Sequence, residues 1–223
     1  MRLRKGIGAA IAIGVAACTA PLVAAAPASA TTGNAEVSVV HGIPNTPVDV
    51  YVDGKRVLHD FKFGSVAGPL SLHPGKYSVA IRPDNASSKS KPILSATVKL
   101  WSGENATLTA NLTATGSPAL NAFVNPTSAV PAGKARVIVR HVAEAPGVDV
   151  YAGSTKVITD LTNPHQAQLV IPAGSVSVSV NVTGTTTTVI GPATFKFKSK
   201  TTTIVYAIGS ATAKSLTVAV QTY

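Results

Sequence analysis

Cysteine is almost missing from this chain, and its scarcity excludes several kinds of chemistry at once. Cys18 is the single cysteine among 223 residues, and it lies in a segment that we predict below to be removed. A chain without thiols forms no disulfide, has no cysteine nucleophile and offers no cysteine ligand to zinc. Its stability must then come from a large core, which two units of roughly 95 residues can supply as β-sandwiches.

Acidic residues are also scarce. Nine Asp and Glu stand against 19 Lys and Arg, for a formal net charge of +10. Without the basic residues Arg2, Arg4 and Lys5 the charge is +7, and residues 131–223 carry +5 of it. A basic exported protein meets anionic polymers first, such as cell-wall glycopolymers or a membrane surface. Moderate positive charge also simply keeps a protein soluble.

The N-terminus predicts export. Three basic residues precede an apolar stretch from Ile7 to Ala17, and Ala28-Ser29-Ala30 is a small-residue cleavage site. We therefore predict a signal peptide over residues 1–30, cleaved so that the secreted or wall-associated protein begins at Thr31. The apolar stretch is too short to predict a transmembrane segment. The alternative is a lipoprotein anchored through Cys18, because Val15-Ala16-Ala17-Cys18 resembles a lipobox.

Helical periodicity is missing from the rest of the chain, which instead repeats itself. Val, Ile and Thr dominate, and no apolar pattern of helical period lasts a dozen residues. Residues 36–51 read EVSVVHGIPNTPVDVY, and residues 136–151 read RVIVRHVAEAPGVDVY. Seven of these residues recur 100 positions on without a gap, and this fixed register indicates a duplicated unit.

The repeat divides the chain into two predicted units, residues 36–125 and 135–223, joined by a Pro/Gly-containing linker over residues 126–134. Each unit has seven or eight short strands separated by turn residues, which predicts an all-β protein of two tandem antiparallel β-sandwiches. A closed barrel is the alternative. Alternation predicts that eight valines are buried: Val37, Val39, Val48, Val50, Val137, Val139, Val148 and Val150.

Longer motifs in both units support a family resemblance. The runs V-x-V-x-H at Val37, VDVYVDG at Val48, FGSV at Phe63 and L-x-P-G-x-Y-x-V at Leu72 resemble the DUF4397 family, whose extracellular domains often occur in tandem in actinobacteria and other bacteria. The resemblance implies an Ig-like sandwich in an extracellular or envelope setting, and it implies no catalytic residues. The second unit departs from it where Asn163-Pro164 replaces Phe63-Gly64.

One polar pair recurs in both units: His41 with Asp49, and His141 with Asp149. Such a pair could be a general base and the group that orients it, but no nucleophile recurs with it. The structural interpretation is that the histidine caps the first strand and the aspartate accepts loop N–H groups. We predict no catalytic residue. Asp49, Asp53 and Asp60 form no calcium-loop motif and the histidines lack zinc spacing, so we predict no metal and no cofactor.

Lys196, Lys198 and Lys200 alternate with Phe195 and Phe197. If this run is one strand, the ammonium groups share a face and could bind an anionic polymer or membrane surface. The alternative is an edge strand whose lysines prevent aggregation. Because the aromatic rings lie on the opposite face, we predict no nucleic-acid binding.

The leading hypothesis is therefore a non-enzymatic binding or scaffolding protein, secreted or associated with the cell envelope. Duplication supports it, because two weak sites on one chain gain avidity. Two alternatives remain: an envelope hydrolase or transferase with an unrecognised His/Asp site, and a purely structural matrix component. The sequence names neither the ligand nor the oligomeric state.

Overall fold

The structure, a computed structural model, describes residues 33–223; the predicted signal peptide and Cys18 lie outside the described residues. The described chain forms strands, turns and loops and is all-β. Within residues 33–223, no helix could cross a membrane. Residues 32–223 form one compact unit.

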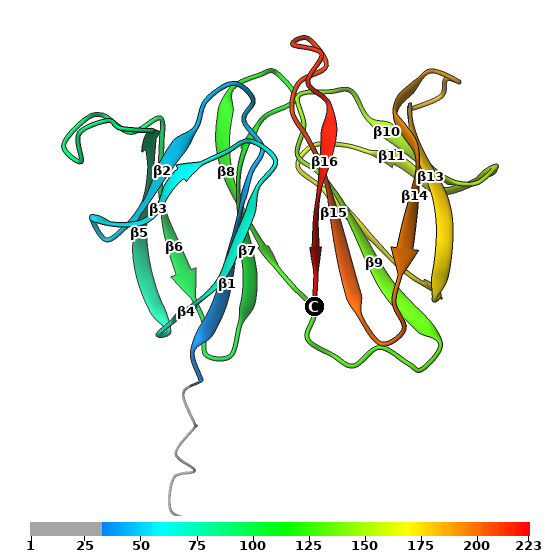
Figure 1. The fold of residues 1–223 in the computed structure, drawn as a ribbon, viewed down its shortest axis with the longest axis horizontal. Helices are drawn as coiled ribbons and strands as arrows, with labels where there is room; N and C mark the ends of the chain where they lie inside the picture. Colours follow the sequence, from blue (N-terminus) through cyan, green and yellow to red (C-terminus); the bar gives the residue numbers. More distant parts are fainter. Residues whose placement is uncertain (1–32) are drawn as a thin grey trace, which may run out of the picture. The chain divides into compact units, whose positions relative to one another are not determined.

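Eight strands build the first sandwich, at the upper end of the predicted number. Four of them form one sheet in the order β4-β1-β7-β8, and the others form the facing sheet in the order β3-β2-β5-β6 (Figure 1). They are β1 (Ala35–His41), β2 (Val48–Val52), β3 (Lys55–Phe61), β4 (Val66–Leu72), β5 (Gly75–Pro83), β6 (Leu94–Leu100), β7 (Asn105–Leu112) and β8 (Pro118–Val124).

Eight further strands build the second sandwich in the same order, with sheets β12-β9-β15-β16 and β11-β10-β13-β14. The duplication in the sequence is thus a duplication of topology. The strands are β9 (Lys134–His141), β10 (Val148–Ala152), β11 (Thr155–Leu161), β12 (Gln166–Pro172), β13 (Gly174–Val182), β14 (Thr188–Phe197), β15 (Thr202–Ile208) and β16 (Thr217–Thr222).

Each sandwich departs from a purely antiparallel arrangement at one place. β1 pairs with β7 in parallel, and β9 pairs with β15 in parallel, while the other pairs are antiparallel. The parallel pairing is possible because a long crossover separates the two strands in the chain. In the first sandwich this connection comprises β2 and β3 of the facing sheet, β4 at the edge of the sheet of β1, and then β5 and β6 of the facing sheet.

The turn predicted at Asp53-Gly54 is present. Val52 pairs with Lys55, so the hairpin between β2 and β3 has a two-residue loop. Both loop residues have positive φ, 48° at Asp53 and 77° at Gly54. This is the conformation that a type I′ turn requires and that Asp-Gly adopts readily.

Side chains from the outer faces of two sheets, one in each sandwich, pack into a shared apolar cluster. Val40 of β1 lies with Ile138 of β9 and with Ile204, Tyr206 and Ile208 of β15, all fully buried. A hydrogen bond from Gln221 Nε2 to Ser38 Oγ (3.0 Å) crosses the same contact. β7 and β15 are therefore buried on both faces. Strands of a sandwich commonly have one face in the core and the other in solvent.

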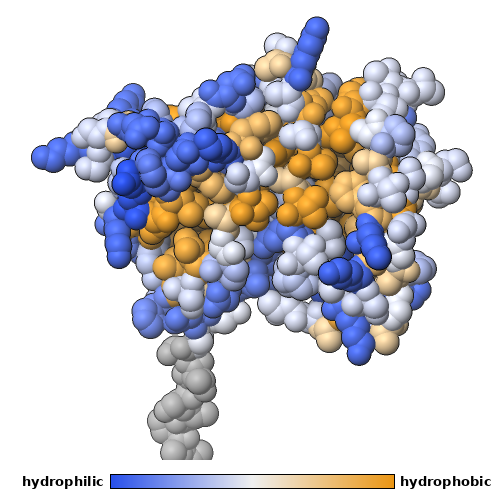
Figure 2. All heavy atoms as spheres, viewed as in Figure 1, coloured by the Kyte–Doolittle hydropathy of each residue, from blue (hydrophilic) through white to orange (hydrophobic). Residues whose placement is uncertain are grey.

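The two sandwich interiors are filled to different degrees. The void inside the first is about 20 Å³, and the cavity inside the second is about 100 Å³. Seven of the eight predicted valines are buried, but Val139 is only half-buried and lines the larger cavity. The expectation that it is buried like Val39 is wrong for this reason. Figure 2 shows apolar surface over the second sandwich, between β14 and β16.

Candidate functional site

The repeated histidines cap the turns that leave β1 and β9. His41 Nε2 donates to the carbonyl of Thr46 (2.7 Å), and its Nδ1 accepts the backbone N–H of Ile43 (3.4 Å). His141 makes the same two bonds, to Pro146 O (2.9 Å) and from Ala143 N (3.4 Å). A carbonyl can only accept, so this network assigns the neutral Nε2–H tautomer to both rings.

The same bonds limit what these histidines can do chemically. Burial lowers the pKa of His41 and of His141, and the carbonyl partner of each ring only partly opposes this effect. The basic nitrogen of each ring is already occupied by a backbone N–H. A general base needs a free nitrogen within reach of the proton that it removes, which neither histidine offers here.

The structure does not bring His41 to Asp49, although the two recur together in the sequence. Asp49 is fully buried on β2, and its carboxylate faces β3. Its Oδ1 accepts from His59 Nδ1 (2.9 Å) and from the N–H of Asp60 (3.1 Å), and its Oδ2 accepts from Arg56 Nη1 (3.0 Å). The carboxylate therefore holds the irregular end of β3 against β2, where the pairing register shifts.

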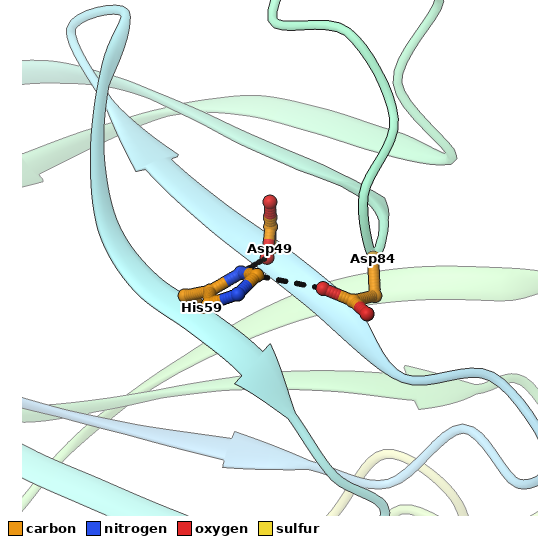
Figure 3. A group of neighbouring side chains, drawn as sticks. All are labelled: Asp49, His59 and Asp84. Carbon is orange, nitrogen blue, oxygen red and sulfur yellow. Dashed lines mark hydrogen bonds and ion pairs between the residues drawn. The ribbon is translucent and has the colours of Figure 1, made fainter.

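His59 stands between two carboxylates, those of Asp49 and Asp84 (Figure 3). Its Nδ1 is 3.3 Å from Asp84 Oδ1, a close contact that lacks hydrogen-bond geometry. Burial raises the pKa of Asp49, but the bonds from His59, Arg56 and the Asp60 N–H outweigh burial and leave this pKa below its ordinary value.

Asp49, His59 and Asp84 place one ligand atom each within 4.8 Å of one another, a spacing that a metal ion could bridge. Both oxygens of Asp49 already accept bonds from N–H donors, two of which are cationic or can become so. A metal would have to replace the hydrogen bond between His59 Nδ1 and Asp49 Oδ1 and bind beside the Arg56 guanidinium. The donor set therefore suits an internal ion-pair network better than a cation site.

Asp149 has the same position in the second sandwich with simpler partners. Lys156 Nζ lies 2.5 Å from its Oδ2. The Asp149 carboxylate also accepts the backbone N–H groups of Asp160 (2.9 Å) and Gly184 (3.3 Å). The bonds from Lys156 and Asp160 lower the pKa of Asp149 and outweigh its burial. The histidine and the second carboxylate of the first sandwich have no counterpart here, because the strand pairing places Thr159 and Thr183 at the positions of His59 and Asp84.

The three predicted lysines are all exposed, but they do not share one strand face. β14 ends at Phe197, so Lys196 alone lies within the strand, and Lys200 follows in a turn with a φ of 64°. In this turn the Lys200 N–H donates to the carbonyl of Lys134 (2.8 Å). Phe195 and Phe197 stack inside the sandwich, with their centroids 6.1 Å apart. The structure adds Lys134 to the group, and we call these four residues the lysine cluster.

Sequence reasoning did not select His59, Asp84 or Lys134. His59 and Asp84 occur in one unit only, so a search for repeated residues passes over them. Lys134 lies more than 60 positions before Lys200, and only the return of the chain at β15 brings them together. A sequence signal does exist for His59 and Asp84. In both units a buried aspartate, Asp49 or Asp149, precedes a strand with a shifted register, β3 or β11. The polar residues of that strand could have been examined as partners of the aspartate.

The fold and these polar networks define the class: an all-β protein of two β-sandwiches with the same strand order. The chain belongs to the DUF4397 family, described as a domain of unknown function, whose sequence profile matches residues 35–151. The match covers the first sandwich and continues into β10. The family carries no assigned activity, and no enzyme family is indicated.

Solved structures include one described as the Bacillus anthracis TIE protein, at 14% identity and a TM-score of 0.25. The alignment covers 78% of this chain and 33% of that one, so this chain spans about a third of its length. At this TM-score, neither fold nor function follows from the likeness. No curated protein matches the chain.

Proposed function

We propose that this protein is exported and acts in the cell envelope as a non-enzymatic binding or scaffolding protein that holds an anionic polymer. The predicted signal peptide and the family's extracellular setting support export. The observation that carries the binding proposal is the lysine cluster: Lys134, Lys196, Lys198 and Lys200 are exposed, and among residues 33–223 none of them forms an ion pair.

The acidic residues of the second sandwich leave this positive charge uncompensated. Among residues 33–223, none of its three acidic residues, Glu144, Asp149 and Asp160, forms an ion pair with the lysine cluster, and Asp149 is paired with Lys156 instead. A free positive cluster raises the local concentration of a polyanion, and its attraction is screened over about 8–10 Å at physiological salt. Wall glycopolymers and anionic membrane surfaces both present such charge.

The test is retention on isolated cell walls as salt is raised. Changing Lys196, Lys198 and Lys200 to Gln should lower the salt concentration at which the protein elutes, and should leave folding unchanged, because exposed substitutions usually alter stability by about 0.5 kcal/mol or less. The matched control changes Lys76, Lys89 and Lys91, which are equally exposed on the first sandwich. If both triple variants elute with the wild type, the lysine cluster does not hold the protein to the wall, and only Lys196 can protect the edge of β14.

A second candidate, an envelope hydrolase, is favoured by His59 alone. Asp49 holds its Nδ1, the ring is about half exposed, and among the described residues its Nε2 has no hydrogen-bond partner. This is the arrangement of a general base with its orienting acid. Wall polymer fragments incubated with the wild type and with His59→Gln would decide: turnover lost in the variant supports an enzyme, and no turnover by the wild type removes this candidate.

A further inference from the structure

We infer that the interior of the second sandwich is a binding site for the alkyl chain of an amphiphile. This site is separate from the lysine cluster and does not depend on the function proposed above. The cavity of about 100 Å³ lies between the sheets of β9 and β10 and is lined by Val, Ala, Ile, Leu and Phe side chains, with Tyr151 as the one lining residue that carries a polar side-chain atom.

The comparison with the first sandwich shows why the cavity exists. Strand registers match the two interiors position by position. Among the residues that line the two spaces, five matched positions have the smaller side chain in the second sandwich, and Phe195 and Phe197, in place of Val98 and Leu100, restore only part of the lost volume. The five exchanges are Val52 to Ala152, Tyr77 to Val176, Ile81 to Val180, Leu108 to Val205 and Leu120 to Val218.

The cavity is open at one edge of the sandwich. In the first sandwich the edge strands β6 and β8 lie against each other and close the space between the sheets. The matching strands β14 and β16 make no comparable contact. Val220 pairs with Val205, so both side chains lie on the inner face of their sheet, yet Val220 is 43% exposed. Apolar surface is visible at this edge (Figure 2).

Size and chemistry select the occupant. Water needs two to four polar partners in a cavity, and an engineered apolar cavity of about 150 Å³ stays dry and binds benzene. A space of about 100 Å³ is too small for a strand or surface of a second protein. It suits the end of an alkyl chain, which can enter at the edge between β14 and β16 and leave its polar end in solvent.

Methyl-labelled protein titrated with octanoate tests the site by NMR. We expect saturable shifts at the methyl groups of Val178, Val205 and Val218, and none at Leu108 and Leu120 in the first sandwich. Methyl octanoate should bind as well; a preference for the acid or for the ester tells whether the natural chain comes from a free fatty acid or an esterified lipid.

The variant Val205→Leu with Val218→Leu restores the side chains of the first sandwich and should weaken octanoate binding at least tenfold. The control, Val124→Leu with Val170→Leu, adds the same methylene groups at two exposed positions and should bind like the wild type. Wall retention by the lysine cluster should stay unchanged in both variants, so this proposal and the proposed function fail separately.

A series from butanoate to decanoate on the wild type keeps the test decisive if the filled variant does not fold. Affinity should rise with each methylene until the cavity is full and then level off. The inference is overturned if no acid shifts the cavity methyl groups, if both sandwiches respond equally, if benzene binds and alkyl chains do not, or if the filled variant binds like the wild type.

Discussion

The first and second sandwiches have the same strand order and the same pairing, but they place their polar and apolar groups differently. The first has a well-filled interior and surrounds its buried Asp49 with Arg56, His59 and Asp84. The second keeps the buried Asp149 with one lysine and leaves a cavity between its sheets. Duplication has preserved what the fold needs, a histidine cap and a buried acid, and has allowed the rest to diverge.

The largest expected effect is the loss of stability when the same core position of each sandwich is changed from Val to Asp. Val50→Asp places an unpaired charge in the filled interior, which costs several kcal/mol and is comparable to the stability of a small domain. Val150→Asp should cost less, because its carboxylate can draw water into the open cavity. Urea unfolding of the two variants measures the difference. Equal losses would show that the cavity does not admit water to a charge at Val150.

The next effect concerns the contact between the sandwiches, where Arg140 occupies the position that Val40 has in the first unit. Arg140 is fully buried and, among residues 33–223, has no carboxylate partner; it donates to Tyr206 Oη (2.9 Å), Asn125 Oδ1 (2.8 Å) and Gln166 Oε1 (2.8 Å). Its cation also lies over the ring of Phe123, 4.4 Å from the centroid. Burial lowers the pKa of Arg140, although Tyr206 opposes this effect.

Arg140→Val should therefore cost about 3 kcal/mol, because it leaves several buried groups with fewer partners. We expect the two sandwiches to unfold in separate steps in this variant, detected by hydrogen exchange at β7 and β15. The control is Lys196→Val, which removes an exposed cation of the second sandwich away from this contact. A single unfolding step with unchanged stability would show that the apolar cluster around Tyr206 alone joins the sandwiches.

Sequence alone predicted the sandwiches well, because each depends on local patterns. Alternating valines, the Asp53-Gly54 turn and the repeated register are short-range signals, and they led to the right fold class. The contact between sandwiches was missed, although Val40 and Ile138 break the alternation and could have indicated strands buried on both faces. The outer faces of β1 and β9, which carry Val40 and Ile138, were instead assumed to be in solvent.

The candidate sites were harder to predict for a different reason. His41 and Asp49 recur together but serve different turns, so shared recurrence reflected two structural needs rather than one site. His59 and Asp84 meet only through the pairing of β2 with β3 and β5, and pairing partners are not fixed by spacing along the chain. The cavity follows from small differences in side-chain size at five positions, which become meaningful only when the registers of both sandwiches are known.

A smaller effect, shared by both sandwiches, is the pH dependence of their histidine caps. The folded state holds His41 and His141 neutral with a lowered pKa, so the unfolded chain binds protons first as pH falls below about 6.5. The free energy of unfolding should then decrease as pH falls, by at most about 1.4 kcal/mol for each histidine between pH 6.5 and 5.5. The pKa values of the buried Asp49 and Asp149 carboxyls are lowered by their hydrogen bonds, so these two groups stay ionised in this window.

His41→Gln keeps a donor toward Thr46 and removes one titrating group, so about half of this pH dependence should remain. His141→Gln should behave in the same way, and the double variant should be nearly independent of pH in this window. Urea unfolding at pH 7.5, 6.5 and 5.5 measures it. Undiminished dependence in the double variant would show that the two histidine caps do not produce it.

The smallest expected effect is the change in stability when the side chains of one matched pair, Leu108 and Val205, are exchanged between the two interiors. Leu108→Val should destabilise the first sandwich by about 1 kcal/mol, because removing a methylene from a filled core loses its transfer energy and leaves a void. Val205→Leu should stabilise the second by about 0.5–1 kcal/mol, since filling a cavity is a common stabilising change. The two changes are in different sandwiches and should be nearly additive, so the double variant should unfold close to the wild type. Thermal unfolding of all three variants without added lipid measures these differences. If Val205→Leu destabilises instead, as overpacking does, the cavity does not extend to this side chain and the difference between the two interiors lies nearer to Ala152 and Val176.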